Sequence, residues 1–278
     1  MARERVERDD DRPASAHRSG FVERRPAARL SSLVSCSWVS VLPEGGQAVR
    51  RIIPDASVDI VWMDGSVHVA GPDTRPVVAR LPAGTVVAGI RFRPGAAPSL
   101  LGVPASSLRD ERIDLALLWG RSATDALLER IGRAAAVPAA VMDVLESEIA
   151  ARLPSAAPAD RIVEQVVSEL RSGSPGPRIR TLARRLYVSE RPLLRRCEAA
   201  VGYGPKTLAR VLRPHRFLAL AERSGLRPSE LASIAGYADP PHLSRECREL
   251  TGTTPARLLA ERGVQERHGR SRRPPGDV

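Results

Sequence analysis

The chain has 278 residues, of which 42% are hydrophobic, and it carries a formal net charge of +11. This length and composition predict a soluble globular protein with two modest domains. No stretch approaches the roughly 18 apolar residues that span a bilayer, and the charged start of the chain is unlike a secretory signal, so we expect a cytoplasmic protein with no membrane segment. The three cysteines show no C-x-x-C spacing, which argues against a disulfide framework and against a cysteine-rich zinc module.

The excess positive charge is confined to the C-terminal part of the chain. Residues 176–278 carry 21 Arg plus Lys against 10 Asp plus Glu, a difference of +11, whereas residues 1–175 carry 22 against 22. Such a polarised distribution is typical of a nucleic-acid-binding module joined to a domain with a different role.

The N-terminal part has the pattern of a β-rich domain. Residues 1–20 mix both charge signs and predict a disordered leader. From Leu33 to Phe92, short β-branched runs follow one another about ten residues apart with turn residues between them, which predicts an antiparallel sandwich or a small barrel. Asp64-Gly65 suits a type I′ hairpin turn. We therefore expect a β-rich domain over residues 21–120.

The period of the apolar residues then changes from that of strands to that of helices. Residues 121–160 have apolar positions three and four apart and predict a helical connector. A further helical pattern follows, and the Gly- and Pro-rich stretch at 173–177 then breaks the chain. Residues 262–278 are basic without an apolar face, which predicts a disordered tail.

A duplicated motif occupies residues 161–261. In the first copy, Ile179, Leu182 and Leu186 share one helical face, and a second apolar stripe begins at Leu193 after a short break. Two short helices joined by a tight turn are therefore predicted, with Ser189 as the cap of the second helix.

The second copy repeats this arrangement in the stretch "LASIAGYADPPHLSRECRELTG". Gly236 supplies the turn and Asp239 is a good N-cap, so Pro240 and Pro241 lie in the first turn of a helix, where a missing N–H costs little. Leu182 matches Leu231 at an offset of 49 residues. At an offset of 50, the matched pairs are Leu193 with Leu243, Arg195 with Arg245, Cys197 with Cys247, Gly202 with Gly252, and Pro205 with Pro255.

Two helix-turn-helix units predict binding to double-stranded DNA. The second helix of such a unit lies in the major groove, where arginine can bind guanine, leucine can contact a thymine methyl group and serine can reach a phosphate. Residues 205–224 predict a continuous linker helix of about 30 Å, close to the roughly 34 Å between successive major grooves. The candidate DNA-binding residues are Ser189, Arg191, Leu194, Arg195, Pro241, His242, Ser244 and Arg245.

At residues 162–261 the chain resembles the DNA-binding domain of AraC-type (arabinose-regulator) transcription factors. The motifs "LARRLYVSERPLLRRC", "GYGPKTLARVLR", "IAGYADPPHLSREC" and "TGTTPARLL" carry the resemblance. It implies a sequence-specific transcriptional regulator whose partner is promoter DNA, and RNA polymerase if it activates. Residues 21–120 look like the β-rich domain of related bacterial regulators, which implies effector sensing or homodimerisation. Cys197 and Cys247 depart from the phenylalanine usual in the family.

A small barrel can hold one ligand, and four residues are candidates for an effector pocket: Cys36, Trp38, Trp62 and Arg91. The alternative is that Cys36 and the two tryptophans are ordinary core side chains. The scattered carboxylates and a single histidine have no metal-ligand spacing, so we expect no metal site.

Two other classes of function fit the sequence less well than regulation. A DNA-repair enzyme with the same DNA-binding domain needs a zinc-held cluster of four cysteines, which this chain lacks, and no catalytic or cofactor-binding motif occurs. We therefore expect neither catalysis nor a cofactor. A nonspecific architectural DNA-binding protein would explain the charge but not the β-rich domain.

Overall fold

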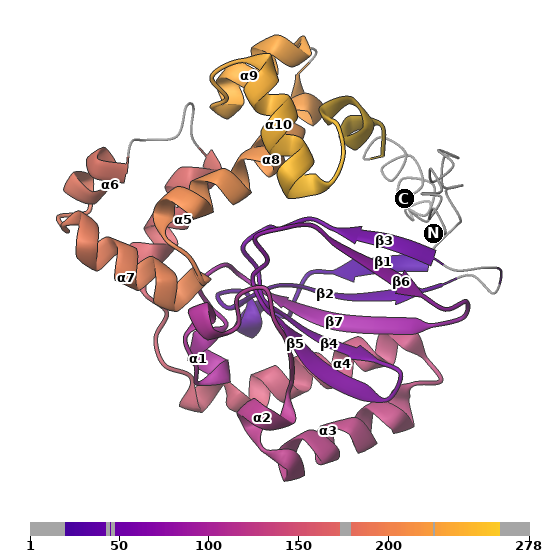
Figure 1. Cartoon of the computed structure of the whole chain (residues 1–278). Coiled ribbons are helices and arrows are strands. Elements are labelled where there is room, and N and C mark those ends of the chain that lie inside the picture. Colours follow the sequence, from indigo (N-terminus) through magenta and orange to yellow (C-terminus); the bar gives the residue numbers. More distant parts are fainter. Residues whose placement is uncertain (1–19, 43–44, 46–47, 173–178, 225, 262–278) are drawn as a thin grey trace, which may run out of the picture.

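The computed structural model describes residues 20–42, 45, 48–172, 179–224 and 226–261. The described chain has a β-rich N-terminal part and a helical C-terminal part (Figure 1), which confirms the fold class that the sequence predicts. Apart from Gly20, the predicted leader lies outside the described residues, as do the predicted break at 173–177 and the predicted tail. No helix in the described ranges is long and apolar enough to cross a membrane.

The N-terminal part is built on a six-stranded antiparallel sheet with the order β1-β2-β7-β4-β5-β8. Its hairpin between β4 and β5 turns at Asp64 and Gly65, whose φ angles of 49° and 73° suit the predicted type I′ turn. Because β1 and β8 are edge strands, the sheet does not close into a barrel. The strands are β1 (Gly20–Arg24), β2 (Val34–Val41), β4 (Asp59–Met63), β5 (Ser66–Ala70), β7 (Val86–Phe92) and β8 (Arg112–Asp114).

A two-stranded antiparallel ribbon forms the second sheet. It consists of β3 (Ala48–Ile52) and β6 (Val77–Leu81). In Figure 1 it lies on the side of the main sheet opposite to the helices α3 (Arg121–Ala134) and α4 (Pro138–Arg152). The sequence predicts either a sandwich or a small barrel. The structure has two separate sheets and is therefore closer to a sandwich.

The helices α3 and α4 cover one face of the main sheet. Their buried residues, which include Ile131 and Leu145, share a single hydrophobic core with strand residues such as Ile60 and Ile90. At the edge of this core, Ser37 Oγ on β2 donates to Glu146 Oε1 on α4 over 2.6 Å. The helices that the sequence predicts as a connector therefore complete the N-terminal core. The short helices α1 (Pro98–Leu101) and α2 (Ala116–Trp119) precede them.

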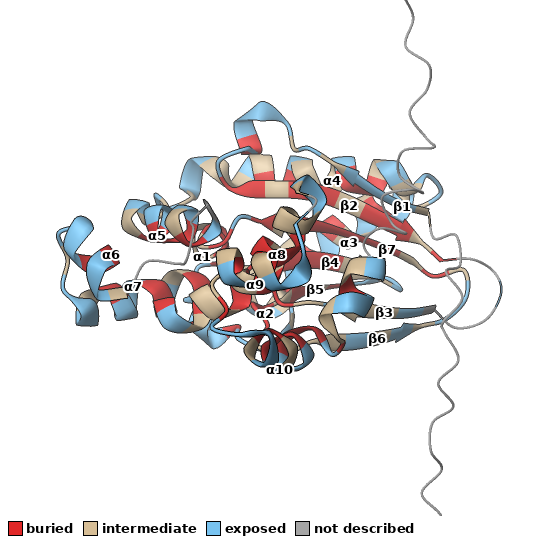
Figure 2. Ribbon diagram, turned by 90° about the horizontal axis from the view of Figure 1, so that it is seen from above, coloured by how far each residue is buried: buried red, intermediate tan, exposed pale blue. Residues whose placement is uncertain are grey.

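The C-terminal part contains two helix-turn-helix units, α6–α7 and α9–α10, joined by the long helix α8. The first unit packs with α5 around a core that includes Leu182 and Leu193, and the second unit packs around Leu231 and Leu243. Figure 2 shows that α6 and the start of α7 are largely exposed at one end of the molecule. The helices are α5 (Arg161–Ser172), α6 (Ile179–Arg185), α7 (Glu190–Val201), α8 (Pro205–Arg223), α9 (Pro228–Ala235) and α10 (Pro240–Thr251).

Candidate nucleic-acid interface

The second helix of the first unit, α7, presents a polar face to solvent. Leu193, Cys197 and Val201 are buried, because they recur at the spacing of one helical face. Arg191 and Arg195 are exposed on the other side, and the apolar side chain of Leu194 is 41% exposed between them. Such a helix can place guanidinium groups and one apolar side chain in a groove.

Ser189 holds the N-cap position of α7 with extended backbone angles (φ −79°, ψ 161°). Its hydroxyl makes no capping hydrogen bond to the helix, unlike the cap that the sequence predicts. At the first helical position, Glu190 pairs with Arg180 of α6 over 3.0 Å. The exposed Ser189 hydroxyl is thus available to a phosphate oxygen.

The second unit begins its helix α10 in the way that the sequence predicts. Asp239 is the N-cap, and its Oδ1 accepts from the backbone N–H of His242 over 2.6 Å. Pro240 and Pro241 follow in the first turn, and Arg245 is exposed one turn further on. Ser244 is half-buried beside it.

His242 lies inside the motif rather than on its outer face. Its ring meets the ring of Tyr237 edge-on with centroids 5.5 Å apart, and its Nδ1 accepts from the N–H of Ala238 over 3.1 Å. Only 33% of its side chain is exposed. In this position the histidine fixes the turn before α10, and DNA contact by its ring stays a prediction.

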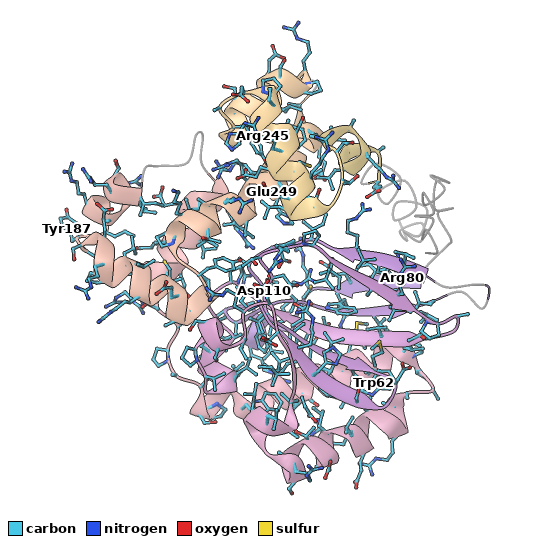
Figure 3. The ribbon with its side chains drawn as sticks, in the orientation of Figure 1. Trp62, Arg80, Asp110, Tyr187, Arg245 and Glu249 are labelled. Atoms are coloured by element: carbon cyan, nitrogen blue, oxygen red, sulfur yellow. The ribbon has the colours of Figure 1, made fainter. Side chains whose placement is uncertain are left out.

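Three candidate arginines are free to bind an anion. Within the described part of the chain, no acidic side chain forms an ion pair with Arg191, Arg195 or Arg245. Their neighbour Arg196 differs, because it pairs with Asp160 over 2.9 Å. Figure 3 shows Arg245 on the side of the C-terminal domain away from the sheet. Unpaired guanidinium groups at equivalent positions of two helices suit phosphate and guanine binding.

Tyr187 is an interface candidate that the sequence analysis missed. It lies in the turn between α6 and α7, is 97% exposed, and has a φ of 54°. At the offset of 49 it corresponds to Gly236, whose φ is 90°. This correspondence was a signal in the sequence, because both turns need a left-handed residue and only the first uses one with a large side chain. A fully exposed tyrosine next to α7 can donate to a phosphate (Figure 3).

The structure divides the four predicted pocket residues between the two faces of the main sheet. In the strand register Cys36 lies opposite Arg91, and Trp38 is next but one to Cys36, so these three side chains share the face away from α4. Trp62 lies opposite Ala88 and packs into the core on the helix face (Figure 3).

The three residues on the shared face belong to a polar cluster. The Arg91 guanidinium binds Asp59 through hydrogen bonds of 3.0, 3.3 and 2.9 Å, and Asp59 also accepts from Trp38 Nε1 over 3.2 Å. Asp55 lies 3.5 Å from the same guanidinium. Burial raises the pKa of the Cys36 thiol to about 12, so it is protonated at neutral pH and is not a nucleophile.

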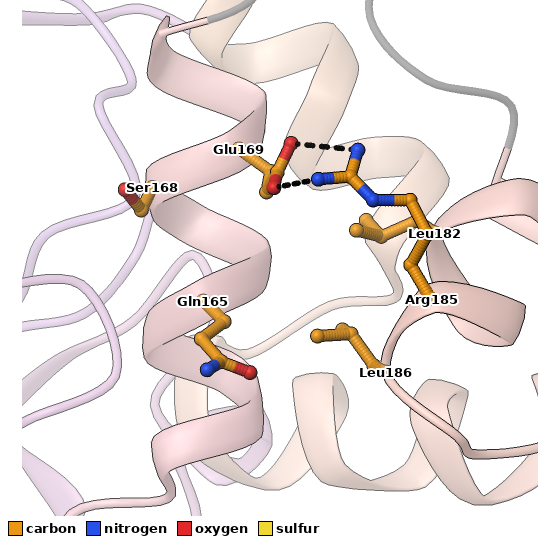
Figure 4. Close-up of a pocket in the computed structure, with 6 residues that line it drawn as sticks. All are labelled: Gln165, Ser168, Glu169, Leu182, Arg185 and Leu186. Atoms are coloured by element: carbon orange, nitrogen blue, oxygen red, sulfur yellow. Dashed lines mark hydrogen bonds and ion pairs between the residues drawn. The ribbon is translucent and has the colours of Figure 1, made fainter.

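Two cavities are found elsewhere in the described structure. The first, of about 280 Å³, lies between α5 and α6, where Glu169 and Arg185 form an ion pair at its edge (Figure 4). The second, of about 460 Å³, lies between the start of α1 and α7, and Arg195 and Arg196 reach it. None of the four predicted pocket residues lines either cavity.

Models of known protein families match two separate parts of the chain. Residues 182–261 match the family described as a helix-turn-helix domain, and residues 22–114 match a domain of unknown function, DUF6597. No curated protein matches the chain. Two such helix-turn-helix units define a DNA-binding protein. The chain carries an AraC-type helix-turn-helix domain behind a β-rich domain of unknown function.

The chain also has low similarity to several solved structures. The C-terminal domain of AraT, a response regulator from Geobacillus stearothermophilus, is 19% identical, with a TM-score of 0.34, over 37% of this chain and 86% of that chain. ToxT from Vibrio cholerae is 11% identical, with a TM-score of 0.44, over 81% of this chain and 96% of that chain. A ToxT structure with bound unsaturated fatty acid is 10% identical, with a TM-score of 0.39, over 87% and 94%.

Proposed function

We propose that this protein is a sequence-specific transcriptional regulator that binds two successive major grooves of promoter DNA with α7 and α10. The observation that carries the proposal is that Arg195 and Arg245, at equivalent positions of the two repeats, have no acidic partner among the described residues. The helix α8 between the units has 19 residues and is therefore about 28 Å long. This length suits two helices placed in adjacent grooves, which are roughly 34 Å apart.

The proposed effector role of the N-terminal domain is supported by a chain of contacts that reaches the DNA-binding domain. Trp38, Asp59 and Arg91 form one polar cluster, and Arg91 also faces Asp55. Asp55 belongs to a loop whose next residue, Ala56, is buried in the core of the first helix-turn-helix unit. An effector on the Trp38 face would act along this path, with a coupling free energy of about 1 to 3 kcal/mol.

The further partners in the proposal are a second copy of the chain and, for an activator, RNA polymerase. Val49 on β3 and Val78 on β6 are each 52% exposed on the ribbon, an apolar surface that pairing of two copies would cover. The proposal contains no catalytic step, and it places the protein in the cytoplasm with the DNA that it binds.

The DNA-binding proposal is tested by selecting genomic fragments with the purified full-length protein at near-physiological salt. The comparison is with an Arg195→Ala, Arg245→Ala variant, and the control is Arg80→Ala, Arg133→Ala, which removes the same charge from exposed positions of the N-terminal part. We expect the wild type and the control to enrich one motif, and the test variant to lose it, since each base-binding arginine contributes about 1 to 3 kcal/mol. Equal affinity of the wild type for all sequences would instead indicate the nonspecific architectural protein.

The effector proposal needs a separate measurement. Affinity for the selected DNA, oligomeric state and transcription from the selected promoter are compared between the full chain and a chain that starts at residue 157. We expect at least one of the three to change when the β-rich domain is removed. If all three stayed the same, the N-terminal domain would have no regulatory role.

A further inference from the structure

The N-terminal domain touches the same end of both DNA-binding helices. Gly202 ends α7 and Gly252 ends α10, and both have left-handed φ angles of 87° and 67°. A Cβ atom on Gly202 would lie 2.5 Å from Pro72 Cγ, and one on Gly252 would lie 3.5 Å from Pro76 Cγ. One loop, residues 71–76 between β5 and β6, therefore reaches the carboxyl ends of the two helices at repeat-equivalent positions.

An arginine of the N-terminal domain accompanies each of these contacts. Arg109 Nη1 donates to the carbonyl oxygen of Gly202 over 3.3 Å. Arg51 of β3 lies beside Gly252, with its Nε 3.6 Å from where a Cβ would be, and it pairs with Glu261 over 3.2 Å. A positive charge at the carboxyl end of a helix is favourable, because the helix dipole is negative there.

The loop that makes these contacts is held firmly by its own domain. Thr74 donates to Asp110 Oδ1 from both its N–H and its hydroxyl, over 2.6 and 2.9 Å. Asp73 is buried and accepts two hydrogen bonds from Arg112, over 3.0 and 2.7 Å. Asp110 lies where the two domains meet (Figure 3). A loop fixed in this way can transmit the position of the β-rich domain to both helices.

A second loop braces the helix that links the two units. Ile53 packs against the core of the second unit, and Ala56 is buried in the core of the first. Between them, the carbonyl oxygen of Pro54 lies 2.7 Å from Nε2 of His215 on α8. Because a carbonyl oxygen only accepts, Nε2 carries the proton in this hydrogen bond.

The contact between Pro54 and His215 lies next to a proline inside α8. Pro214 lies inside the helix, and a proline there has no N–H for the bond to the carbonyl four residues earlier, which loosens or kinks a helix. The linker helix alone therefore fixes the distance between α7 and α10 less firmly than a helix without an internal proline would. The contact to His215 supports the adjoining residue from outside the helix.

We propose that the N-terminal domain sets the distance and orientation between α7 and α10, so that Arg109 and Arg51 are positioning residues for DNA binding. This inference rests on the proposed function. Its consequence is that the operator must have a fixed spacing between its two half-sites. One inserted base pair moves the second half-site by about 3.4 Å and rotates it by about 34°, so a rigid protein must lose contacts there.

The test uses the full-length protein and the DNA motif selected by the wild type. Affinity is measured for that DNA and for duplexes with one or two base pairs inserted or removed between the half-sites. We expect the wild type to bind each altered duplex at least about tenfold more weakly, the order of one mismatched base pair. For Arg51→Ala, Arg109→Ala we expect this discrimination to fall to less than about threefold, because the two helices then adjust their spacing.

The control is again Arg80→Ala, Arg133→Ala, which removes two positive charges away from the domain junction and should keep the wild-type discrimination. When Arg109→Lys replaces Arg109→Ala in the double variant, a donor and a charge are retained, and part of the discrimination between spacings should return. Unchanged discrimination in a folded Arg51→Ala, Arg109→Ala variant would overturn the inference and leave the proposed function standing, as would equal losses in the control. A wild type with no preferred DNA motif would instead remove the proposed function and this inference together. If the double variant did not fold, the single change Arg109→Gln would supply the same comparison.

Discussion

Glu246 of α10 and Arg213 of α8 form an ion pair in which the carboxylate is only 7% exposed. Arg210, which is also on α8, lies 3.3 Å from Glu246, and its guanidinium forms an ion pair with the exposed Glu249 as well. Arg213 further lies over the ring of Tyr237, at 5.3 Å from its centroid. Two arginines of the linker helix thus hold the DNA-binding helix of the second unit through one buried carboxylate.

Removing this carboxylate should destabilise the protein. Glu246→Ala leaves two guanidinium groups without their buried partner, and both have routes to solvent, so we expect a loss of about 1 to 3 kcal/mol in the free energy of unfolding. Glu249→Ala is the matched control, because its side chain is 62% exposed, and it should cost less than about 1 kcal/mol. Urea unfolding followed by circular dichroism measures both. Equal effects would show that the buried pair contributes no more than the exposed one.

A substitution in the turn between α6 and α7 should stabilise the protein. Tyr187 holds a φ of 54°, which costs a side-chain-bearing residue about 1 kcal/mol relative to glycine. Because the side chain is 97% exposed and packs on nothing, Tyr187→Gly should raise the free energy of unfolding by up to that amount. If the ring also contacts a phosphate, the same variant should bind every DNA sequence more weakly. Lower stability in Tyr187→Gly would contradict the strain argument.

The duplicated motif shows what the sequence can predict about this fold. Each helix of a unit is defined by neighbours in the sequence, so the apolar spacing and the cap at Asp239 are enough to predict where α10 begins. The change of offset from 49 to 50 also has a local cause. One residue separates Tyr187 from the N-cap Ser189, whereas two separate Gly236 from Asp239, so the second turn is one residue longer.

The effector candidates show what the sequence could not predict. Alternation within β2 shows that Cys36 and Trp38 share a face, but the face of a residue on another strand depends on the register between strands. Trp62 lies opposite Ala88, whereas Trp38 lies opposite Gly89 on the same strand β7, so the two tryptophans point to opposite sides. The helices of residues 121–152 pose the same difficulty, because an apolar stripe shows that a face is buried but not what buries it.

The polar cluster at Arg91 should be important for the stability of the β-rich domain. Arg91→Ala leaves Asp59, which is 8% exposed, without its cationic partner, and we expect a loss of about 3 kcal/mol in the free energy of unfolding. Arg93→Ala is the control, since its side chain is exposed and, among the residues that the structure describes, donates only to the carbonyl of Ser31. The emission of Trp38, whose Nε1 donates to Asp59, should also change in Arg91→Ala. A variant as stable as the control would mean that Asp59 needs no partner.

Alkaline pH should destabilise the protein through its buried thiols. Burial raises the pKa of Cys36 and that of Cys197 from 9.0 to about 12. The folded state therefore keeps protons that the unfolded state loses above pH 9, so the stability from each thiol is complete below pH 9 and falls as the pH rises towards 12. Between pH 8 and pH 10 we expect a loss of about 1.4 kcal/mol for each thiol. The measurement is urea unfolding across this range. The buried Tyr203 and Tyr237, whose pKa is raised by burial as well, add to the loss as the pH approaches 10, so the contribution of the thiols is taken from the difference between variants.

The thiols are identified as the cause by removing them. Cys36→Ala, Cys197→Ala should lower stability at pH 8, because two buried side chains become smaller, but its further loss up to pH 10 should be about 3 kcal/mol less than in the wild type. Ser40→Ala, which changes a buried side chain that does not titrate in this range, should keep the wild-type dependence. A double variant that lost stability with pH as steeply as the wild type would show that the two thiols ionise without unfolding, and hence that their surroundings admit water.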